Sequence, residues 1–529
     1  MGDIEFLIAV LFAAAVLVRL ADLVAIPYPI VLVIGGVAIG FTPGLPDIQL
    51  EPEAVFLLFL PPLLHASGFR ASPQELRAAA AQLISLTFAL VVVTMCAVAV
   101  AGHEALGLSW PVAFVLGAIL APTDPVSAAA TFGRLGAPER VAIAVEAEAM
   151  LNDAAALVAY RLAAGAAVAG AFSIEHAAWE FVRTAAGGVI VGLAVCWIGE
   201  RLQRRLNDVP LAIFLSVLFA YGAYIGAERI GASGVLATVI AGVWFGWRAH
   251  EMFDADTRLS AIAFWQVLVF GLNAALFVLL GLQFEGVFDD ARGGSGTGEL
   301  LVDVVIVSAV VIVSAVVIGV RMAWVGIAPL LARVVPAAGR ADTGDDWRER
   351  LVVGWSGMRG AISLAAALAL SHEIDERELL IFVTVGVIAV TLVGQGLTLG
   401  PLMRRLRIEG ERAWSPDEAI GRLEAAQAAL DRLDELEREG RISEERLRRM
   451  RELYRARFRR CMAVIGGDSD EARGEAAHDT IERYSALRRE LIGVERGAIL
   501  GLRDDGLLRQ DTMRLIQRDL DLEEARLPA

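Results

Sequence analysis

Four polar side chains that could bind a proton or a small cation lie within one long apolar run. The run VEAEAMLNDAAALV carries Glu146, Glu148, Asn152 and Asp153. An acid inside a membrane helix is costly and is a functional candidate by default. Asp153 follows Glu146 by seven residues, so the two share a helix face, and Glu146 is a candidate access funnel to Asp153. Glu148 points about 140° away from Asp153, which favours a structural role for Glu148.

A second apolar run is interrupted by the sequence Pro122-Thr123-Asp124-Pro125. Two prolines three residues apart remove two backbone donors and clash with the preceding turns, so a continuous helix is not expected. Free carbonyls at membrane depth are tolerated where they line a cavity or are buried in protein. A broken helix that carries an acid is a recurring way to build a cation site in a secondary transporter. Asp124 is therefore a second candidate ligand.

A third apolar run, GWSGMRGAISLA, contains three glycines and the basic residue Arg359. The glycines loosen the helix, and a buried guanidinium needs an acid or free carbonyls. The second and third runs fall in opposite halves of the apolar part of the chain. This placement is typical of an inverted repeat with its site where two interrupted helices cross.

Charge divides the chain into two parts. Of the 109 charged residues, 55 fall within positions 1–400 and 54 within the last 129 positions, while apolar residues make up 56% of the whole. We therefore expect an all-α polytopic membrane domain over 1–405 and a cytoplasmic helical, coiled-coil-like tail over 406–529.

The net charge of −15 argues against nucleic-acid binding and suits a protein that handles cations. Three scattered cysteines support neither a disulfide framework nor a zinc site.

Thirteen stretches are long and apolar enough to cross a bilayer core that is about 30 Å thick. No basic residue precedes the first one, so we expect a retained span and not a cleaved leader. The expected spans are 4–25, 28–42, 53–68, 77–102, 110–132, 139–170, 177–200, 209–227, 232–247, 259–282, 300–332, 349–371 and 378–402.

The loops between these spans predict the orientation. With thirteen spans, sixteen arginines fall in the loops on the side of the tail and three in the loops on the opposite side. Cytoplasmic loops carry the excess of basic residues. We therefore expect a multi-pass protein of the cell (inner) membrane, embedded in the lipid bilayer, with its N-terminus outside and its tail in the cytoplasm.

The motifs APTDP, E-x-E-x-x-L-N-D and GxRGAxSLA, in this order, resemble those of the monovalent cation:proton antiporters of the NhaP and NHE type. The resemblance covers residues 1–405. It implies thirteen spans, a core with two crossed unwound helices, a separate dimerisation domain and a homodimer. It also implies exchange of one monovalent cation for one proton, with no cofactor and no enzymatic activity.

The resemblance also implies roles for individual residues. Asp153 would be the essential carboxylate that binds cation and proton in turn, and Asn152 would support it. Asp124 and the carbonyl of Thr123 would lie at the crossing. Glu148 and Arg359 would form a stabilising ion pair.

Two departures from the family pattern bear on the choice of cation. Ala66 stands where the family commonly has an acid, and Ala149 stands where it often has a serine. Na⁺ is the first expectation, and K⁺ is the alternative, with Li⁺ also a candidate, because fewer ligands mean weaker dehydration of the ion. His65, which precedes Ala66, is a candidate accessory group because histidine titrates near neutral pH.

Two other classes of function fit the sequence less well. A cation channel would use symmetric rings or repeated filters, whereas two acids on different broken helices suit alternating access. The sequence Gly354-Trp355-Ser356-Gly357 is similar to the motif of intramembrane serine proteases, but Met358 breaks G-x-S-x-G.

The tail has its own helix signals. Pro416 followed by two acids predicts a helix start, and a second helix is expected from Ser443 to about Val464. Further helices are expected at about 470–500 and 507–525. The tail should therefore form a small bundle or a coiled-coil hairpin, with a regulatory or dimer-supporting role.

Overall fold

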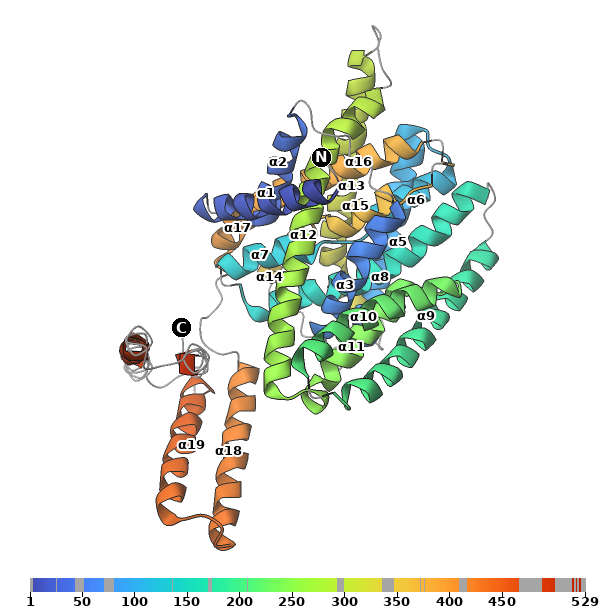
Figure 1. Ribbon diagram of the computed structural model, residues 1–529. Coiled ribbons are helices and arrows are strands. Elements are labelled where there is room, and N and C mark those ends of the chain that lie inside the picture. Colours follow the sequence, from blue (N-terminus) through green and yellow to red (C-terminus); the bar gives the residue numbers. More distant parts are fainter. Residues whose placement is uncertain are drawn as a thin grey trace. The chain divides into compact units, whose positions relative to one another are not determined.

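The protein folds as two helical units (Figure 1). The structure, a computed structural model, describes residues 3–24, 26–42, 52–70, 80–135, 137–169, 174–206, 208–292, 299–334, 347–371, 373–374, 376–408, 416–465 and 488–499, with a few single positions near the C-terminus. Every regular element within these ranges is a helix. The first unit is Met1–Gly410 and the second is Glu411–Ala529.

The first unit, which we call the body, is a multi-pass helical array. Within the described residues, seven of its helical segments are long and apolar enough to cross a membrane, and four more are apolar but shorter. The total of thirteen spans stays a prediction. In chain order the helices are α1 (Asp3–Leu23), α2 (Tyr28–Gly40), α3 (Pro52–Arg70), α5 (Ala80–Leu106), α6 (Trp110–Leu120), α7 (Pro125–Leu135), α8 (Glu139–Ala169), α9 (Ile174–Gln203), α10 (Val209–Arg229), α11 (Gly234–Met252), α12 (Ala255–Arg292), α13 (Glu299–Val334), α14 (Trp347–Trp355), α15 (Ala361–Leu368), α16 (Arg377–Ala389), the π-helix η1 (Val390–Gln395) and α17 (Gly396–Leu406).

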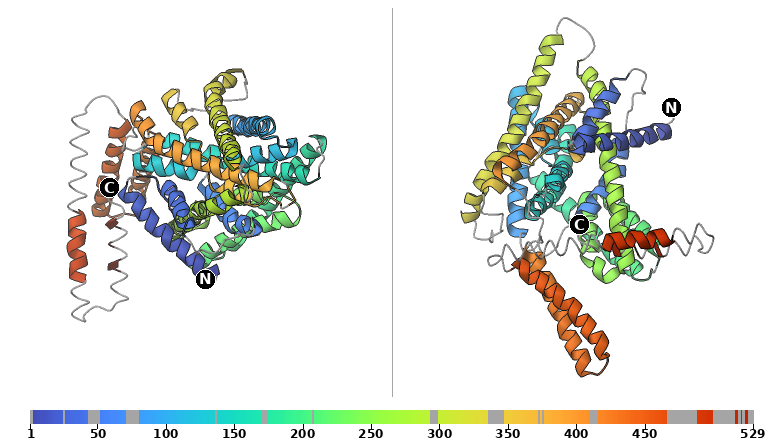
Figure 2. Two further views of the ribbon diagram at one scale, coloured as in Figure 1. Left: turned by 90° about the horizontal axis from the view of Figure 1, so that it is seen from above. Right: turned by 90° about the vertical axis from the view of Figure 1, so that its left-hand side faces the viewer.

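Two of the expected spans are broken in the middle, as their sequences predict. One ends as α6 at Leu120 and resumes as α7 at Pro125. The other ends as α14 at Trp355 and resumes as α15 at Ala361. The segment that contains α6 and α7 is 78% buried inside the body, compared with 22% for the span in α10. The residues of both breaks, 121–124 and 356–360, are all buried, so the breaks lie among other helices of the body (Figures 1 and 2).

Small residues let two helix pairs approach closely around these breaks. On α2, a Cβ added to Gly36 would meet the backbone of Val278 and Gly281 on α12. On α3, a Cβ added to Gly68 would meet the backbone of α11 around Gly242. Small residues at helix interfaces are the usual means of tight packing in membranes, where lipid provides no hydrophobic drive for association. These contacts fix α3 and α12, which form two walls of the site described below.

The second unit, the tail, contains a helical hairpin. Helices α18 (Pro416–Arg438) and α19 (Glu444–Ile465) run side by side (Figures 1 and 2). Both begin where the sequence predicts, and Gly440 between them adopts a positive φ of 66°, which glycine tolerates without strain. Residues 488–499 are helical as well. Most of the segments expected as helices at 470–500 and 507–525 lie outside the described residues.

Candidate functional site

The two helix breaks contact each other through hydrogen bonds to backbone carbonyls. The N–H of Asp124 donates to the carbonyl of Met358 at 2.7 Å. In return, Nε of Arg359 donates to the carbonyl of Leu120 at 2.9 Å. Gly360 permits this approach, because a Cβ at that position would collide with the side chain of Asp124. Backbone groups freed by one break are thus satisfied by the other, as groups far from water must be.

Asp124 caps the N-terminus of α7. Its Oδ1 accepts from the N–H of Val126 at 3.1 Å, and its Oδ2 accepts from the hydroxyl of Ser127 at 3.1 Å. Aspartate is favoured at this position because the first N–H groups of a helix lack partners within the helix. Both carboxylate oxygens of Asp124 therefore already accept a hydrogen bond.

Asn152 and Asp153 reach the first break from α8. Nδ2 of Asn152 donates to the freed carbonyl of Ala121 at 3.2 Å and lies 3.5 Å from the hydroxyl of Thr123. The side chain of Asp153 is buried, and its Oδ1 has no hydrogen-bond partner among the residues that the structure describes. A buried polar atom without a partner requires an explanation. Asp153 is the acid in this region with an open oxygen.

That side chain lines a small cavity of about 50 Å³. A cavity needs roughly 10–15 Å³ of such volume to hold one water, so a small ion or a few waters would fit. Residues from α3, the first break, α8, α12 and α15 form its walls. Its polar and acidic lining consists of Ser67, Thr123, Asp124, Asp153, Asn273 and Ser363.

The ion pair of Glu148 differs from the expected one. Arg359 does not bond to it. The carboxylate of Glu148 binds Arg321 on α13, at 2.5 Å and 3.3 Å from its two terminal nitrogens. Arg321 also donates to the carbonyls of Val353 and Gly354 at the end of α14. Arg359 bonds to carbonyls instead, those of Leu120 and Gly357. Arg321 thus binds carbonyls at the end of α14, whereas Arg359 binds one carbonyl at the end of α6 and one within the second break.

The remaining expected residues lie outside the cavity lining. The ring of His65 is buried 5.1 Å from that of Trp265 and 6.1 Å from that of Phe245, measured between centroids. Ala66 is buried near Trp265. Glu146, on α8, is partly exposed, and Ala149 is fully buried. The site therefore combines Asp124, Asp153 and Thr123 at the cavity, with Asn152 holding α8 against the break.

Three residues were missed by the sequence reasoning. Arg321 is the only arginine in the expected span 300–332, so the rule that identified Arg359 could have found it. Asn273 and Ser363 are neutral side chains in apolar runs; Ser363 lies within the motif GxRGAxSLA, but a neutral side chain carries no signal comparable to that of a charge. Only the packing of α12 and α15 in the folded protein shows that both residues line the cavity.

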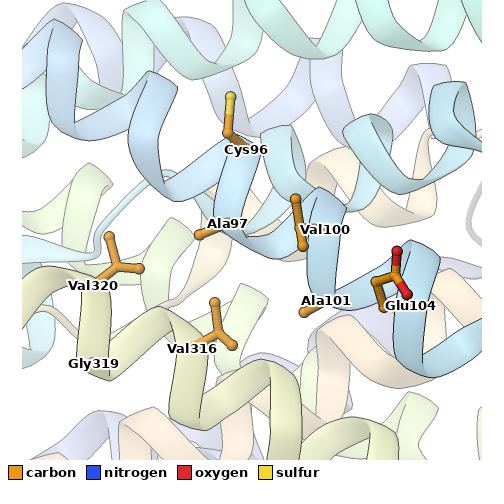
Figure 3. A pocket seen from close by; sticks show the side chains of 8 residues that line it. All are labelled: Cys96, Ala97, Val100, Ala101, Glu104, Val316, Gly319 and Val320. Atoms are coloured by element: carbon orange, nitrogen blue, oxygen red, sulfur yellow. The ribbon is translucent and has the colours of Figure 1, made fainter.

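A second hollow, between α5 and α13, has the wrong chemistry for an ion site. It is an open groove of about 690 Å³ on the surface of the body. Its lining is almost entirely apolar, and the one acid, Glu104, lies toward the end of α5 (Figure 3). Sites for polar ligands bring several polar groups together, and this groove does not.

Comparisons with known proteins agree on the class of protein. The family model described as sodium/hydrogen exchanger, transmembrane, matches residues 7–405. An uncharacterized Na⁺/H⁺ exchanger of Mycobacterium tuberculosis is 33% identical over 513 residues, covering 94% of this chain and 91% of the relative. The Na⁺/H⁺ antiporter ApNhaP of Aphanothece halophytica is 30% identical, over 77% of this chain and 74% of the relative.

One further relative and one solved structure belong to the same class of protein. An antiporter of Bacillus pumilus named for sodium, potassium, lithium, rubidium and H⁺ is 32% identical, over 70% of this chain and 56% of the relative. The sodium proton antiporter MjNhaP1 of Methanocaldococcus jannaschii has a similar fold, with a TM-score of 0.61 at 20% identity over 76% of this chain and 98% of that one.

The resemblance to the NhaP-type antiporters is confirmed by these matches, and with it cation/proton antiport by a multi-pass membrane protein. The broken helices, the acid with an open oxygen and the family match over most of the body agree: the chain belongs to the sodium/hydrogen exchanger family.

Proposed function

We propose that the body exchanges one monovalent cation for one proton, with Asp153 as the group that binds each in turn. The observation that carries this proposal is the carboxylate of Asp153: one of its oxygens is buried without a hydrogen-bond partner among the described residues, and the residue lines a small cavity with several polar groups at the helix crossing. Na⁺ is the first candidate cation. K⁺ and Li⁺ are the alternatives, because the Bacillus pumilus relative is named for several alkali ions.

Competition for one carboxylate is sufficient for coupled exchange. A proton or a cation each neutralises Asp153, whereas an empty charged site would be costly to carry through a low-dielectric barrier. In an alternating-access cycle, in which the site opens to one side at a time, only loaded sites then change sides, and this couples the two fluxes. Replacing one charge by one equal charge makes the cycle electroneutral.

The other residues have supporting roles in this scheme. Asn152 ties α8 to the first break through the carbonyl of Ala121. Asp124 and Thr123 line the cavity, and Glu146 provides negative charge on the cytoplasmic approach to it. The Glu148–Arg321 pair holds α8 against α13 and α14.

We also infer the arrangement in the membrane. The excess of arginine in the loops on the side of the tail supports an outside N-terminus and a cytoplasmic tail. The protein would reside in the cell (inner) membrane as a homodimer. Crosslinking in native membranes tests the dimer, and labelling of single cysteines from either side tests the orientation.

The decisive experiment measures proton flux in liposomes that contain the purified protein. Na⁺, K⁺ and Li⁺ are tested separately, each with and without a clamped membrane potential. Asp153→Asn should abolish cation-driven proton flux while the protein still folds, because the amide cannot hold a proton or a cation charge in turn. Glu104→Gln, an acid outside the cavity, is the matched control and should retain exchange.

Two results would refute this function. Retained exchange in folded Asp153→Asn would remove Asp153 from the mechanism. Current carried by one cation alone, without proton movement, would indicate a channel.

A further inference from the structure

We propose that Asn273 and Ser363 are neutral oxygen ligands of the transported alkali cation and set which cation the site prefers. This inference rests on the function proposed above and names how the same site would select its substrate. Asn273 lies outside the three motifs that carry acids and arginines, and Ser363 is the serine of GxRGAxSLA.

Ser363 is one of the residues that line the cavity. It lies in the first turn of α15, its side chain is 1% exposed, and its Oγ has no hydrogen-bond partner among the described residues. The burial of such an atom carries a desolvation cost that is not offset unless something binds it. Because Ser363 and Asp153 line the same cavity, a cation there would satisfy both open oxygens.

Asn273 contributes from a different direction. It is 3% exposed on α12, within the otherwise apolar sequence Leu272-Asn273-Ala274-Ala275, and it lines the same cavity. An amide oxygen is an acceptor with two lone pairs and no charge. A buried amide in an apolar stretch is costly unless a partner is present. Helices α8, α12 and α15 therefore each bring one oxygen-bearing side chain to the cavity.

The charge at the cavity suits a single monovalent ion with neutral supporting ligands. The two oxygens of Asp124 already accept hydrogen bonds from Val126 and Ser127. Asp153 then provides the open carboxylate oxygen. A cation that leaves its water needs oxygens from several sides to replace the hydration shell. Ala66 and Ala149 supply no side-chain oxygen, so the neutral ligands on α12 and α15 take on that task.

Neutral ligands and the acid should affect exchange in different ways. An amide does not titrate, and a serine hydroxyl does not ionise in the working range of pH. Loss of either should weaken cation binding and change the order of preference among Na⁺, Li⁺ and K⁺. The competition between proton and cation, which takes place on Asp153, should keep its pH dependence.

The test compares Ser363→Ala and Asn273→Ala with Ser314→Ala in liposomes containing the full chain. Ser314 is a matched control, because its hydroxyl is also buried and unpartnered among the described residues but does not line the cavity. Each cavity variant should raise the apparent KM for the preferred cation about tenfold, the scale expected when a charged group is deprived of one polar ligand. The ratio of KM values among the three alkali ions should change, and the pH profile at saturating cation should not.

Two additional measurements keep the outcome clear. Ser363→Thr retains the hydroxyl and should restore most of the affinity. If Ser363→Ala or Asn273→Ala purifies poorly, cation-dependent thermal stabilisation of the detergent-solubilised protein reports the same affinity. Wild-type KM values and ion ratios in both alanine variants would overturn the assignment while leaving the function of Asp153 intact. The proposed role of Asp153 is tested separately, because retained exchange in folded Asp153→Asn would refute it.

Discussion

Arg321 in the body and Arg451 in the tail both bind carboxylates, but their surroundings differ. The side chain of Arg321 is 3% exposed and that of its partner Glu148 is 16% exposed. The side chain of Arg451 is 25% exposed, and its partners Asp434 and Glu437 are more than half exposed. The same chemistry is therefore largely shielded from water in one unit and open to it in the other.

The difference shows what a buried charge must do in the body. Arg321 neutralises Glu148 and also donates to the carbonyls of Val353 and Gly354, so one guanidinium satisfies an acid and two carbonyls at the end of α14. Removing one member of such a set strands the others in a medium that cannot hydrate them. In the tail, water can replace a partner that is removed, and a surface pair contributes little.

Arg321→Ala should give the largest effect. Glu148 would remain as an unpaired, largely buried charge, and the two carbonyls would lose their donor. We expect the free energy of unfolding to fall by about 3–5 kcal/mol, the range for breaking a buried pair. Thermal melting of the purified protein in detergent measures this loss.

A double replacement separates the pair from the bulk of its side chains. Arg321→Met combined with Glu148→Leu removes both charges together and should recover much of the stability, because apolar substitutes for a buried pair are often neutral. Wild-type melting of Arg321→Ala alone would show that the pair does not hold α8 to α13.

Asp124 should give an intermediate effect that depends on the replacement. Asp124→Ala removes the cap of α7 and should cost about 1–2 kcal/mol of stability. Asp124→Asn keeps an acceptor for the N–H of Val126 and should melt close to wild type, yet it removes negative charge from the cavity. We expect its apparent KM for the cation to rise about tenfold. Exchange in liposomes and thermal melting, measured on the same two variants, distinguish the role of Asp124 as helix cap from its role as cation ligand. Equal KM values in Asp124→Asn and wild type would limit Asp124 to capping.

The sequence was sufficient to predict the two broken helices and the acids that meet at them. The prolines around Asp124 and the glycines around Arg359 act locally, through donors removed and turns loosened, so their consequences can be derived without knowing the fold. Asp153 and Asn152 were identified because polar groups stand out in an apolar run.

The partner of Glu148 could not be derived in the same way. A buried acid requires a basic partner, but both Arg321 and Arg359 lie in apolar spans, and sequence spacing does not relate separate helices. The placement of α13 and of the break between α14 and α15 decides between them. Asn273 and Ser363 were missed for a related reason, because a neutral polar residue in a span is equally compatible with packing.

Arg451→Ala in the tail should give the smallest effect. Arg451 on α19 reaches Asp434 and Glu437 on α18, the latter at 2.6 Å, and these hydrogen bonds raise its pKa above the usual value. The pair's contribution is therefore present below the ordinary pKa of arginine and is lost only at higher pH. We expect amide hydrogen exchange of α18 and α19 in the full chain to quicken about two- to fivefold at neutral pH. Arg449→Ala, which removes an exposed ion pair with Glu445 within α19, should leave exchange unchanged. If Arg451→Ala destabilised the protein as much as Arg321→Ala does, burial would not explain the difference between the ion pairs of the two units.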